Sequence, residues 1–449
     1  MFRKILVANR GEIAVRVVRA CRELGIPSVA VHSTADADAE HVRLADESVH
    51  IGPAPARRSY LHIPNVVSAA LRAGADAIHP GYGFLSEDPY FAEICASNGI
   101  TFIGPPPDVM EAVGDKASAR RLMTEAGLPL LPGTAEAVAG PEEALAVAGE
   151  LGYPVVVKAL AGGGGRGIAV ARSAAELAHV YLTTRAHAQA VFGDSRVYVE
   201  RFLPVARHIE IQVLADAHGN AVHLGERDCS VQRRHQKLIE ESPSPALDDQ
   251  LRGQIGEAAL LGTKALGYCG AGTMEFLLDD DGRFWFMEMN ARIQVEHPVT
   301  EMVCGIDLVQ QQILVAAGAP LELEQADINL RGHAVEVRIN AEDPDRQFAP
   351  TPGTLTEFRL PAGPGVRVDT HCVPGSSIPA HYDSLIAKLV VWAQDRPAAL
   401  NRMRRALGEV RVEGAGVRTT VPFHQRVLDH PVFRSGDAHT DFLTRHLEV

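Results

Sequence analysis

The chain has 449 residues, about three times the length of a typical domain, so it can form more than one hydrophobic core. Apolar residues make up 46% of the chain and charged residues 22%, without a long apolar run, which excludes a membrane-spanning or wholly disordered protein. The 43 basic and 56 acidic residues give a net charge of −13, which argues against nucleic acid as the main partner.

The six cysteines are spread along the chain without a C-x-x-C pair, so the sequence predicts neither a disulfide framework nor a zinc ribbon. The apolar run at residues 5–8 is too short for the core of a signal peptide. We therefore expect a cytoplasmic protein.

The N-terminal part of the chain alternates β-type and helical runs. The first three runs cover residues 4–8, 11–24 and 28–32. The order strand, helix, strand predicts a right-handed βαβ unit in an open parallel sheet. Two further β-type runs, at 77–79 and 100–103, repeat the pattern. We predict an N-terminal α/β domain over residues 1–114.

The remainder of the chain mixes helices with longer strands. Helices are expected at 115–127, 141–150 and 248–266, and β-type runs at 154–158, 168–171, 208–214 and 272–296. Long alternating strands are typical of antiparallel sheets, so we predict a mixed α+β domain over residues 115–331. Short strands and Pro/Gly turns follow, with helical runs near 396–409 and 419–429 at the end. We place a third domain at 332–449.

A glycine run, Gly162 to Gly167, follows a buried-type strand. It matches G-x-G-x-x-G, but the dinucleotide-binding motif needs a helix directly after the glycines, and residues 168–171 have β character. Ile168 also occupies the position of the P-loop lysine. The remaining interpretation is a strand, glycine loop, strand hairpin that covers a polyphosphate, with Lys158 beside it. The alternative is a mobile turn, which the number of adjacent glycines disfavours.

Two glutamates are predicted to face each other across a hairpin. Asp281-Gly282 is a preferred two-residue turn, and if it joins the two strands, Glu275 lies directly opposite Glu288. Two carboxylates with Cβ atoms about 5 Å apart are destabilising unless a cation or a proton lies between them. Bound Mg²⁺ would resolve this conflict and would also bridge nucleotide phosphates. The apolar flanking residues disfavour the alternative of two solvated acids on an exposed face.

Polar and apolar residues alternate beyond this pair. In an extended chain one face would carry Glu288, Asn290, Arg292, Gln294 and Glu296. An ordinary surface strand has the same pattern, but its continuity with the proposed metal pair favours a reaction surface. Arg292 is suited to hold a planar oxyanion, and Glu296 is suited to act as a base.

The basic stretch at residues 232–237 has two interpretations, a solvated charge run or the anion-binding wall of the same cleft, and the pattern alone does not decide between them. His208 and His235 are far apart in the sequence and differently flanked. We therefore predict no zinc site from these two histidines.

Six short segments of the chain, taken together, are typical of one protein family. They are 8–14 (ANRGEIA), 79–87 (HPGYGFLSE), the glycine run, 226–230 with 232–237 (ERDCS, QRRHQK), 288–299 (EMNARIQVEHPV) and 338–343 (RINAED). This set resembles biotin carboxylase, an ATP-grasp family, and the resemblance extends from the first strand to about residue 446. It implies an N-terminal α/β domain, a central ATP-grasp domain whose subdomain near 131–203 closes as a lid, and a C-terminal domain.

The resemblance also implies roles for individual residues. Those expected to bind ATP are Lys116, Lys158, Gly163, Gly164, Gly165, Gly167, Glu200, Leu203, His208, Gln232 and His235. Those expected to bind Mg²⁺ or Mn²⁺ are Glu275, Glu288 and Asn290. Bicarbonate is expected to lie among Lys237, Arg292, Gln294, Val295 and Glu296, and biotin beside Arg338 and Tyr82.

The implied reaction carboxylates biotin. Glu296 removes the proton of bicarbonate, which is held in line with the γ-phosphate and forms carboxyphosphate and ADP. The lid keeps this unstable intermediate away from water. Carboxyphosphate releases CO₂ and phosphate, the phosphate takes the N1 proton of biotin, and Arg338 stabilises the enolate charge. Capture of CO₂ then gives N1-carboxybiotin.

The resemblance also implies partners. None of the eight methionines is followed by lysine, so the Met-Lys-Met signature of a biotin carrier is absent. We therefore expect a separate biotin carboxyl carrier protein, carboxyltransferase subunits and, from the family, a homodimer. The expected role is the first half-reaction of acetyl-CoA carboxylase in fatty acid biosynthesis. An equivalent subunit of a pyruvate or other acyl-CoA carboxylase is the alternative.

Two alternative functions are compatible with the same fold. Another ATP-grasp ligase would share the metal and phosphate residues, but it would have no need of Arg338 or of the polar row that ends at Glu296. A non-catalytic nucleotide sensor would have no need of the acid pair and the base. We therefore expect an enzyme, a biotin carboxylase ligase.

Overall fold

A five-stranded parallel sheet forms the N-terminal layer of the computed structural model, which describes residues 1–134, 136–161 and 167–447. In spatial order the strands are β3 (Glu47–Gly52), β2 (Ser28–Ser33), β1 (Ile5–Val7), β4 (Ala77–His79) and β5 (Thr101–Phe102). The helices are α1 (Gly11–Glu23), α2 (Glu40–Leu44), α3 (Ile63–Ala73), α4 (Pro89–Ser97) and α5 (Pro107–Gly114). The predicted open parallel sheet is confirmed.

Both faces of this sheet are buried. Ile5 and Val7 belong to a core that includes α1 and α11 (Leu308–Ala316), whereas Leu6 belongs to a core on the other face with α3 and α4. Alternate side chains of a strand point to opposite faces, which explains why β1 is apolar throughout. Because α11 belongs to the central part of the chain, the first core also joins the N-terminal layer to that part.

One eight-stranded antiparallel sheet continues through the rest of the molecule. In spatial order its strands are β13 (Phe284–Asn290), β12 (Gly270–Leu278), β9 (Arg207–Ala215), β10 (Ala221–Arg233), β11 (Gln236–Ser242), β14 (His333–Asn340), β20 (Leu385–Ala393) and β18 (Val366–Thr370). The last three strands come after residue 331. The sheet therefore runs through both the central and the C-terminal parts of the chain.

The two faces of this sheet differ in polarity. On one face, Ile209, Ile211 and other apolar residues of β9 and β12 pack against α9 (Asp249–Ala265), and Val335 and Val337 of β14 pack against α12 (Arg396–Glu409). The intervening residues of the same strands point to the opposite face. They include charged side chains, and α10 (His297–Cys304) lies over the part of that face formed by β11, β14 and β20.

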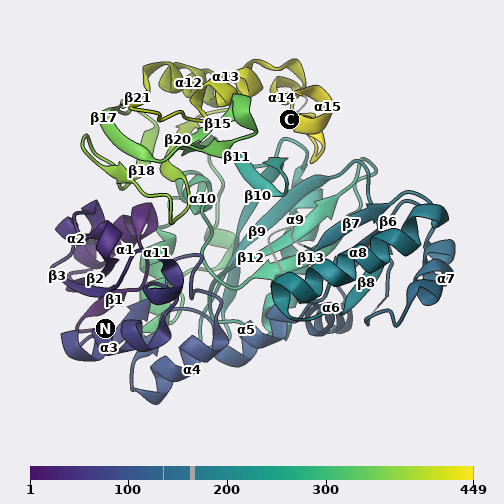
Figure 1. Cartoon of the computed structure of the whole chain (residues 1–449), viewed down its shortest axis with the longest axis horizontal. Coiled ribbons are helices and arrows are strands. Elements are labelled where there is room, and N and C mark those ends of the chain that lie inside the picture. The colour runs from purple at the N-terminus through teal and green to yellow at the C-terminus, as the bar shows by residue number, and fades with distance from the viewer. Residues whose placement is uncertain (135, 162–166, 448–449) are drawn as a thin grey trace.

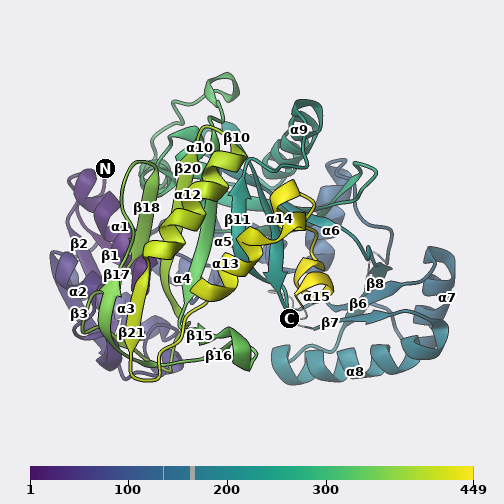
Figure 2. The same ribbon diagram turned by 90° about the horizontal axis from the view of Figure 1, so that it is seen from above.

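The other elements complete the central and C-terminal parts. Besides α6 (Lys116–Glu125), they are α13 (Val421–Asp429), α14 (Pro431–Ser435), α15 (Phe442–His446), β15 (Glu342–Asp343), β16 (Ala349–Pro350), β17 (Gly353–Arg359), β19 (Ser377–Ile378) and β21 (Arg411–Gly414). Short 3₁₀ helices occur at Thr34–Asp36, Ala56–Arg58, Gln325–Asp327 and Pro344–Arg346. Seen from above, α12 crosses β20 (Figure 2). Among the described residues, no helix has the length and apolarity needed to cross a bilayer.

A small subdomain with its own sheet forms the end of the molecule farthest from the N-terminal layer (Figure 1). Its sheet has the order β7 (Ile168–Ala171), β6 (Val155–Ala159), β8 (Val197–Arg201), and α7 (Pro141–Leu151) and α8 (Ala174–Phe192) pack on it. β6 and β7 are antiparallel, as expected for the glycine hairpin. Gly163, Gly164 and Gly165 lie outside the described residues.

Candidate active site

Buried charged side chains gather on the polar face of the eight-stranded sheet. They come from β9, β10, β11, β12 and β14 and from the N-terminus of α10, and they include Glu210, Arg227, Glu240, Glu275 and Glu296, each at most 3% exposed. The period of two within each strand places alternate residues on this face. Charged groups are rarely buried unless they are paired, so their partners define the site.

Lys237 of β11 lies at the centre of this group. Its ammonium contacts Glu210 and lies 2.9 Å from Glu275 Oε1 and 2.7 Å from Glu296 Oε1. Burial acts to lower the pKa of Lys237, but the three carboxylates outweigh it and raise the pKa well above its usual value. The lysine is therefore a permanent cation among three acids.

Glu296 lies between two cations. Besides Lys237, the Arg338 guanidinium lies 2.9 Å from Glu296 Oε2, and it also pairs with Glu240 at 2.6 Å. Burial acts to raise the pKa of Glu296, but the nearby positive charges of Lys237 and Arg338 hold it well below its usual value. The carboxylate is thus ionised, and Lys237 and Arg338 converge on it from two strands.

Arg227 of β10 is fully buried and contacts this group of charged residues. It donates hydrogen bonds to Glu210 and, at 2.8 Å, to Gln294 Oε1. Sequence reasoning assigned no role to Arg227, Glu210 or Glu240. The sequence offered a signal for Glu210 alone, which lies between two isoleucines of an apolar strand, where a charged residue needs a buried partner, whereas Arg227 and Glu240 each adjoin another charged residue.

The predicted opposition of Glu275 and Glu288 is confirmed, because the two residues are cross-strand partners of β12 and β13. The predicted two-residue turn is wrong. Leu278 pairs with Phe284, and the Asp279 amide donates to the Arg283 carbonyl oxygen at 2.9 Å, which leaves three residues, 280–282, in the turn. A bulge next to Glu275 adds one residue to β13, and this compensates for the longer loop. The two deviations cancel at the acid pair.

The acid pair fits a divalent cation. Burial and the negative charge of Glu275 raise the pKa of Glu288. Among the described residues the side chain of Glu288 has no hydrogen-bond or ion-pair partner, whereas the Glu275 carboxylate accepts from Asn290 at 2.8 Å and from Gln294 at 2.9 Å. The negative charge of Glu288 is therefore poorly compensated, and carboxylates with a neighbouring amide are suitable ligands for Mg²⁺.

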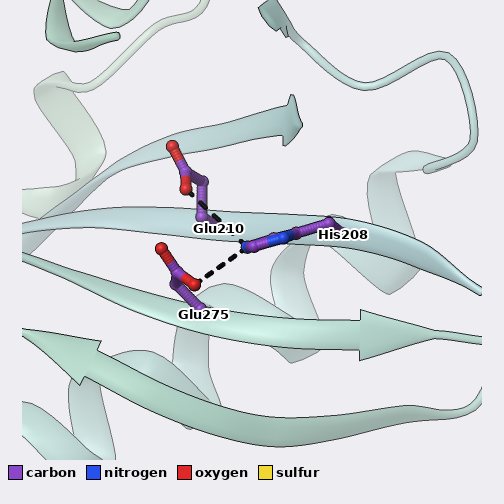
Figure 3. A group of neighbouring side chains, drawn as sticks. All are labelled: His208, Glu210 and Glu275. Carbon is purple, nitrogen blue, oxygen red and sulfur yellow. Dashed lines mark ion pairs between the residues drawn. The ribbon is translucent and has the colours of Figure 1, made fainter. Parts of the chain in front are cut away.

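His208 adds a third potential ligand near Glu275 (Figure 3). The ligand atoms of His208, Glu210 and Glu275 lie within 4.8 Å of one another, and His208 Nε2 is 3.0 Å from Glu275 Oε2. Lys237 already pairs with both glutamates, so this side of Glu275 is neutralised by the protein itself. A cation is better placed on the Glu288 side.

The prediction of one extended polar face as far as Glu296 is wrong beyond Asn290. β13 ends at Asn290, and the chain turns before α10 begins at His297, with Pro298 in the first helical turn, where proline is favoured. The polar side chains meet nonetheless. Arg292 Nη2 donates to Asn290 Oδ1 at 3.0 Å, and Arg292 Nε lies 3.0 Å from a carboxylate oxygen of Glu87, a partner that sequence reasoning missed.

The small subdomain, which is expected to act as the lid, and the start of α6 carry residues expected to bind ATP. Lys158 of β6 lies 2.5 Å from Glu200 of β8. Burial acts to lower the pKa of Lys158, but Glu200 and Tyr198 raise it, with a smaller contribution from Glu288. Burial lowers the pKa of Lys116 although Glu288 acts to raise it. Leu203 follows β8, and Gly167 precedes β7 with a positive φ of 71°. Lys116 and Lys158 therefore both lie within electrostatic range of the acid pair.

The basic stretch at 232–237 is divided between surface and site. Arg234 and His235 form the turn between β10 and β11, both with positive φ. Gln232 pairs with Lys237 across the turn, and only Lys237 of the pair contacts the buried acids. Partial burial and the charges of Lys158 and His208 lower the pKa of His235, which places it near the lid. The stretch is thus an exposed turn at Arg234 and His235 and part of the buried site at Lys237, and anion binding by Lys237 stays a prediction.

Tyr82 lies within electrostatic range of Arg338. Its hydroxyl donates to Glu12 of α1, and burial raises its pKa well above the usual value, with Glu12 adding to the shift and Arg338 opposing it. The loop that follows β4 therefore approaches the face that carries Arg338. A shared role of Tyr82 and Arg338 at biotin stays a prediction.

Three protein-family models match successive parts of the chain. The model for the biotin carboxylase N-terminal domain matches residues 1–110, and the model for the ATP-binding domain of the carbamoyl-phosphate synthase L chain matches 115–324. The model for the biotin carboxylase C-terminal domain matches residues 336–445. The matches follow the order of the predicted domains.

Similar proteins cover the full chain. A biotin carboxylase from Nostoc sp. is 54% identical over 442 residues, 98% of each chain. A pyruvate carboxylase subunit from Methanothermobacter thermautotrophicus is 53% identical, over 99% of this chain and 90% of that protein. The biotin carboxylase domain dimer of Hydrogenobacter thermophilus 2-oxoglutarate carboxylase, solved with MgADP, ADP and bicarbonate, has a TM-score of 0.96 at 47% identity, over 100% and 98% of the two chains.

The family matches, the full-length relatives and the structural similarity agree with the motifs that first indicated a resemblance. The fold class and the enzyme class predicted from the sequence are therefore confirmed. The chain belongs to the biotin carboxylase family, whose members are ATP-grasp ligases.

Proposed function

We propose that the cluster around Lys237 and Glu296 performs the reaction of this family, the ATP-dependent carboxylation of biotin with bicarbonate. The observation that supports this most is the ionised Glu296 carboxylate held between Lys237 and Arg338. A base between two cations suits an anionic substrate whose proton must be removed.

Bicarbonate occupies the space among Lys237, Arg292, Gln294, Val295 and Glu296. Its negative charge competes with Glu296 for Lys237 and Arg338, and as these ion pairs weaken, the pKa of Glu296 rises toward that of a useful base. Glu296 takes the bicarbonate proton, and the freed oxygen attacks the γ-phosphorus of ATP. The products are carboxyphosphate and ADP.

ATP lies between the lid and the acid pair. Lys116, Lys158, Gly163, Gly164, Gly165 and Gly167 hold its phosphates, Glu200 and Leu203 border the adenine, and His208, Gln232 and His235 line the nucleotide site. Glu275 and Glu288, with Asn290 beside them, would hold Mg²⁺, for which Mn²⁺ is an alternative. Bound there, the cation would supply positive charge that neutralises the phosphates of ATP.

Biotin lies beside Arg338 and Tyr82. Carboxyphosphate separates into CO₂ and phosphate, and the phosphate takes the proton from N1 of biotin. Arg338 stabilises the negative charge on the ureido oxygen, and N1 then attacks CO₂. The support for this placement is that Arg338 and Tyr82 lie within electrostatic range of each other while Arg338 also contacts the base.

The test compares two outputs in two variants. Glu296→Ala should lower bicarbonate-dependent ATP cleavage by about 10² to 10⁴ while nucleotide binding persists, because the phosphate ligands lie elsewhere. Arg338→Met should reduce biotin carboxylation more than ATP cleavage, because its main role follows carboxyphosphate formation. Glu241→Gln is the matched control, a buried acid of β11 that pairs with Arg396 on the opposite face. Normal ATP cleavage in Glu296→Ala would remove this residue from the mechanism.

The biotin is attached to a separate carrier protein, and the chain works as a cytoplasmic homodimer with carboxyltransferase subunits. We favour acetyl-CoA as the final acceptor, in fatty acid biosynthesis. The similarity to a pyruvate carboxylase subunit supports the alternative of pyruvate or another acyl-CoA. Identification of the carboxyltransferase that co-purifies with the tagged chain decides the acceptor.

The carrier is tested by kinetics. Tethering raises the effective concentration of biotin, so a biotinylated carrier should have a specificity constant about 10² times that of free biotin, the low end of the gain expected from tethering. An unbiotinylated carrier is the control. Equal specificity constants for the two substrates would contradict a role in a multicomponent carboxylase.

A further inference from the structure

A fully buried lysine of the C-terminal part has no role in the chemistry described above. Lys388 of β20 is 0% exposed and lies on the polar face of the eight-stranded sheet. It is the cross-strand partner of Arg338 on β14 and of Asp369 on β18. The ammonium is thus one strand away from the arginine that contacts Glu296.

The Lys388 ammonium contacts two other parts of the chain. Nζ donates to the carbonyl oxygen of Val295 at 2.9 Å and lies 3.1 Å from Glu12 Oε1. Val295 directly precedes Glu296 in a segment between β13 and α10, outside any strand or helix. Glu12 in turn accepts the hydrogen bond of the Tyr82 hydroxyl. The Lys388 ammonium therefore contacts the main chain next to Glu296, and it also contacts Glu12, the hydrogen-bond partner of Tyr82.

The charges around Lys388 keep it ionised. Burial acts to lower its pKa, but Glu12, Asp369 and Glu336 outweigh it and raise the pKa above the usual value. A buried ion pair is weak support for stability, because desolvation costs about as much as the pairing provides. An apolar side chain of the same length would fill this space. Stability therefore does not explain why position 388 carries a charge, and the contacts of the ammonium suggest a different reason.

We propose that Lys388 is a positioning residue that fixes the bicarbonate subsite and the biotin subsite relative to each other, through the Val295 carbonyl and through Glu12 and Tyr82. This inference rests on the roles proposed above for Glu296 and Tyr82. It assigns to the C-terminal part a task beyond supplying Arg338, because Lys388 holds groups that come from the N-terminal layer and from the segment before α10.

The test measures KM separately for bicarbonate, biotin and ATP. In Lys388→Met, the KM values for bicarbonate and for biotin should each rise about tenfold, as expected for the loss of one charge-assisted hydrogen bond. The KM for ATP should stay within about twofold, because among the described residues the Lys388 ammonium contacts Val295, Glu12 and Asp369 and neither the lid nor the acid pair. A purely structural role would lower the active fraction and the Tm without changing the KM values selectively.

The matched control is Arg396→Met. Arg396 pairs with Glu241 at 2.7 Å on the opposite face, and Glu241 keeps His333 as a second partner, just as Asp369 keeps Arg367 when Lys388 is replaced. We expect this control to lower Tm with unchanged KM values. Lys388→Met with the same kinetics as this control would overturn the inference.

A second variant keeps the test decisive if Lys388→Met fails to fold. Glu12→Gln retains an acceptor but loses the negative charge that pairs with Lys388, and it should raise the KM for biotin more than the KM for bicarbonate. Unchanged KM values in Glu12→Gln would overturn the inference. If the wild-type chain lacks bicarbonate-dependent ATP cleavage, the proposed function fails instead, and the two failures are therefore distinguishable.

Discussion

At the residue scale, the two opposed glutamates have different surroundings. Glu275 is paired with Lys237 and His208, whereas Glu288 has its pKa raised by burial and by Glu275. Glu275→Gln should therefore lower the free energy of unfolding by about 1–3 kcal/mol, the value of charge-assisted hydrogen bonds to a buried group. Glu288→Gln should leave it unchanged or raise it. Both should lose Mg²⁺-dependent turnover, measured beside thermal unfolding. Equal destabilisation by the two changes would contradict this difference.

The acids of the site also predict a pH dependence of stability. The pKa values of Glu275 and Glu296 lie well below the value of 4.5 expected in the unfolded chain, although burial acts to raise them, because Lys237 pairs with both. The unfolded chain thus binds more protons, so the stability they contribute is present above pH 4.5 and is lost as the pH falls below it. In Lys237→Met, Tm should fall less steeply between pH 7 and pH 3 than in the unchanged chain. An unchanged slope would contradict the pairing.

At the element scale, the hairpin of the lid depends on Gly167. Its φ is positive, and a Cβ atom there would lie 2.9 Å from the Cβ of Ala159. Gly167→Ala should strain the hairpin by about 1 kcal/mol or more and raise the KM for ATP. Gly149→Ala is the matched control in the same subdomain, because a Cβ there meets open space within α7 and should stabilise the helix. A normal KM in Gly167→Ala would contradict the lid assignment.

The lid should also respond to nucleotide as a unit. Its three-stranded sheet and two helices have a core of their own, so the subdomain can move as one body. We expect slower hydrogen exchange in β6, β7 and β8 when an ATP analogue and Mg²⁺ are added. Mg²⁺ alone is the control. Equal exchange in both conditions would mean that nucleotide does not close this subdomain.

Several elements could be predicted because their pattern is local. The alternation along β12 and β13 and a turn near Asp281-Gly282 predicted that Glu275 lies opposite Glu288, and this held because the bulge in β13 offsets the error in turn length. The path after Asn290 was not predicted, because five alternating polar residues fit an extended strand and the start of α10 at His297 is a tertiary outcome. Arg227 and Lys388 were missed for the same reason. A buried charge is recognised by its partners, and these come from distant segments.

At the scale of the whole molecule, the shared sheet joins the central and C-terminal parts. β11 pairs with β14 by main-chain hydrogen bonds, and Arg338 and Lys388 lie on strands beyond this junction. A chain cut after residue 331 should expose the edge of β11 and aggregate rather than fold as an independent domain. Size-exclusion chromatography and circular dichroism test this, with the full chain as control. A monomeric, cooperatively unfolding fragment would contradict the dependence.

The junction of β11 and β14 also constrains any exchange of the C-terminal part between relatives. Glu240 pairs with Glu336 across it, and side chains alternate between the two faces along each strand. A chimaera joined here with a slip of one residue would turn Arg338 toward the apolar layer under α12 and bring Ile339 into the reaction space. The chain would retain every motif and still lack the cation that contacts Glu296. In this protein, recombination near residue 331 must preserve strand register as strictly as it preserves catalytic residues.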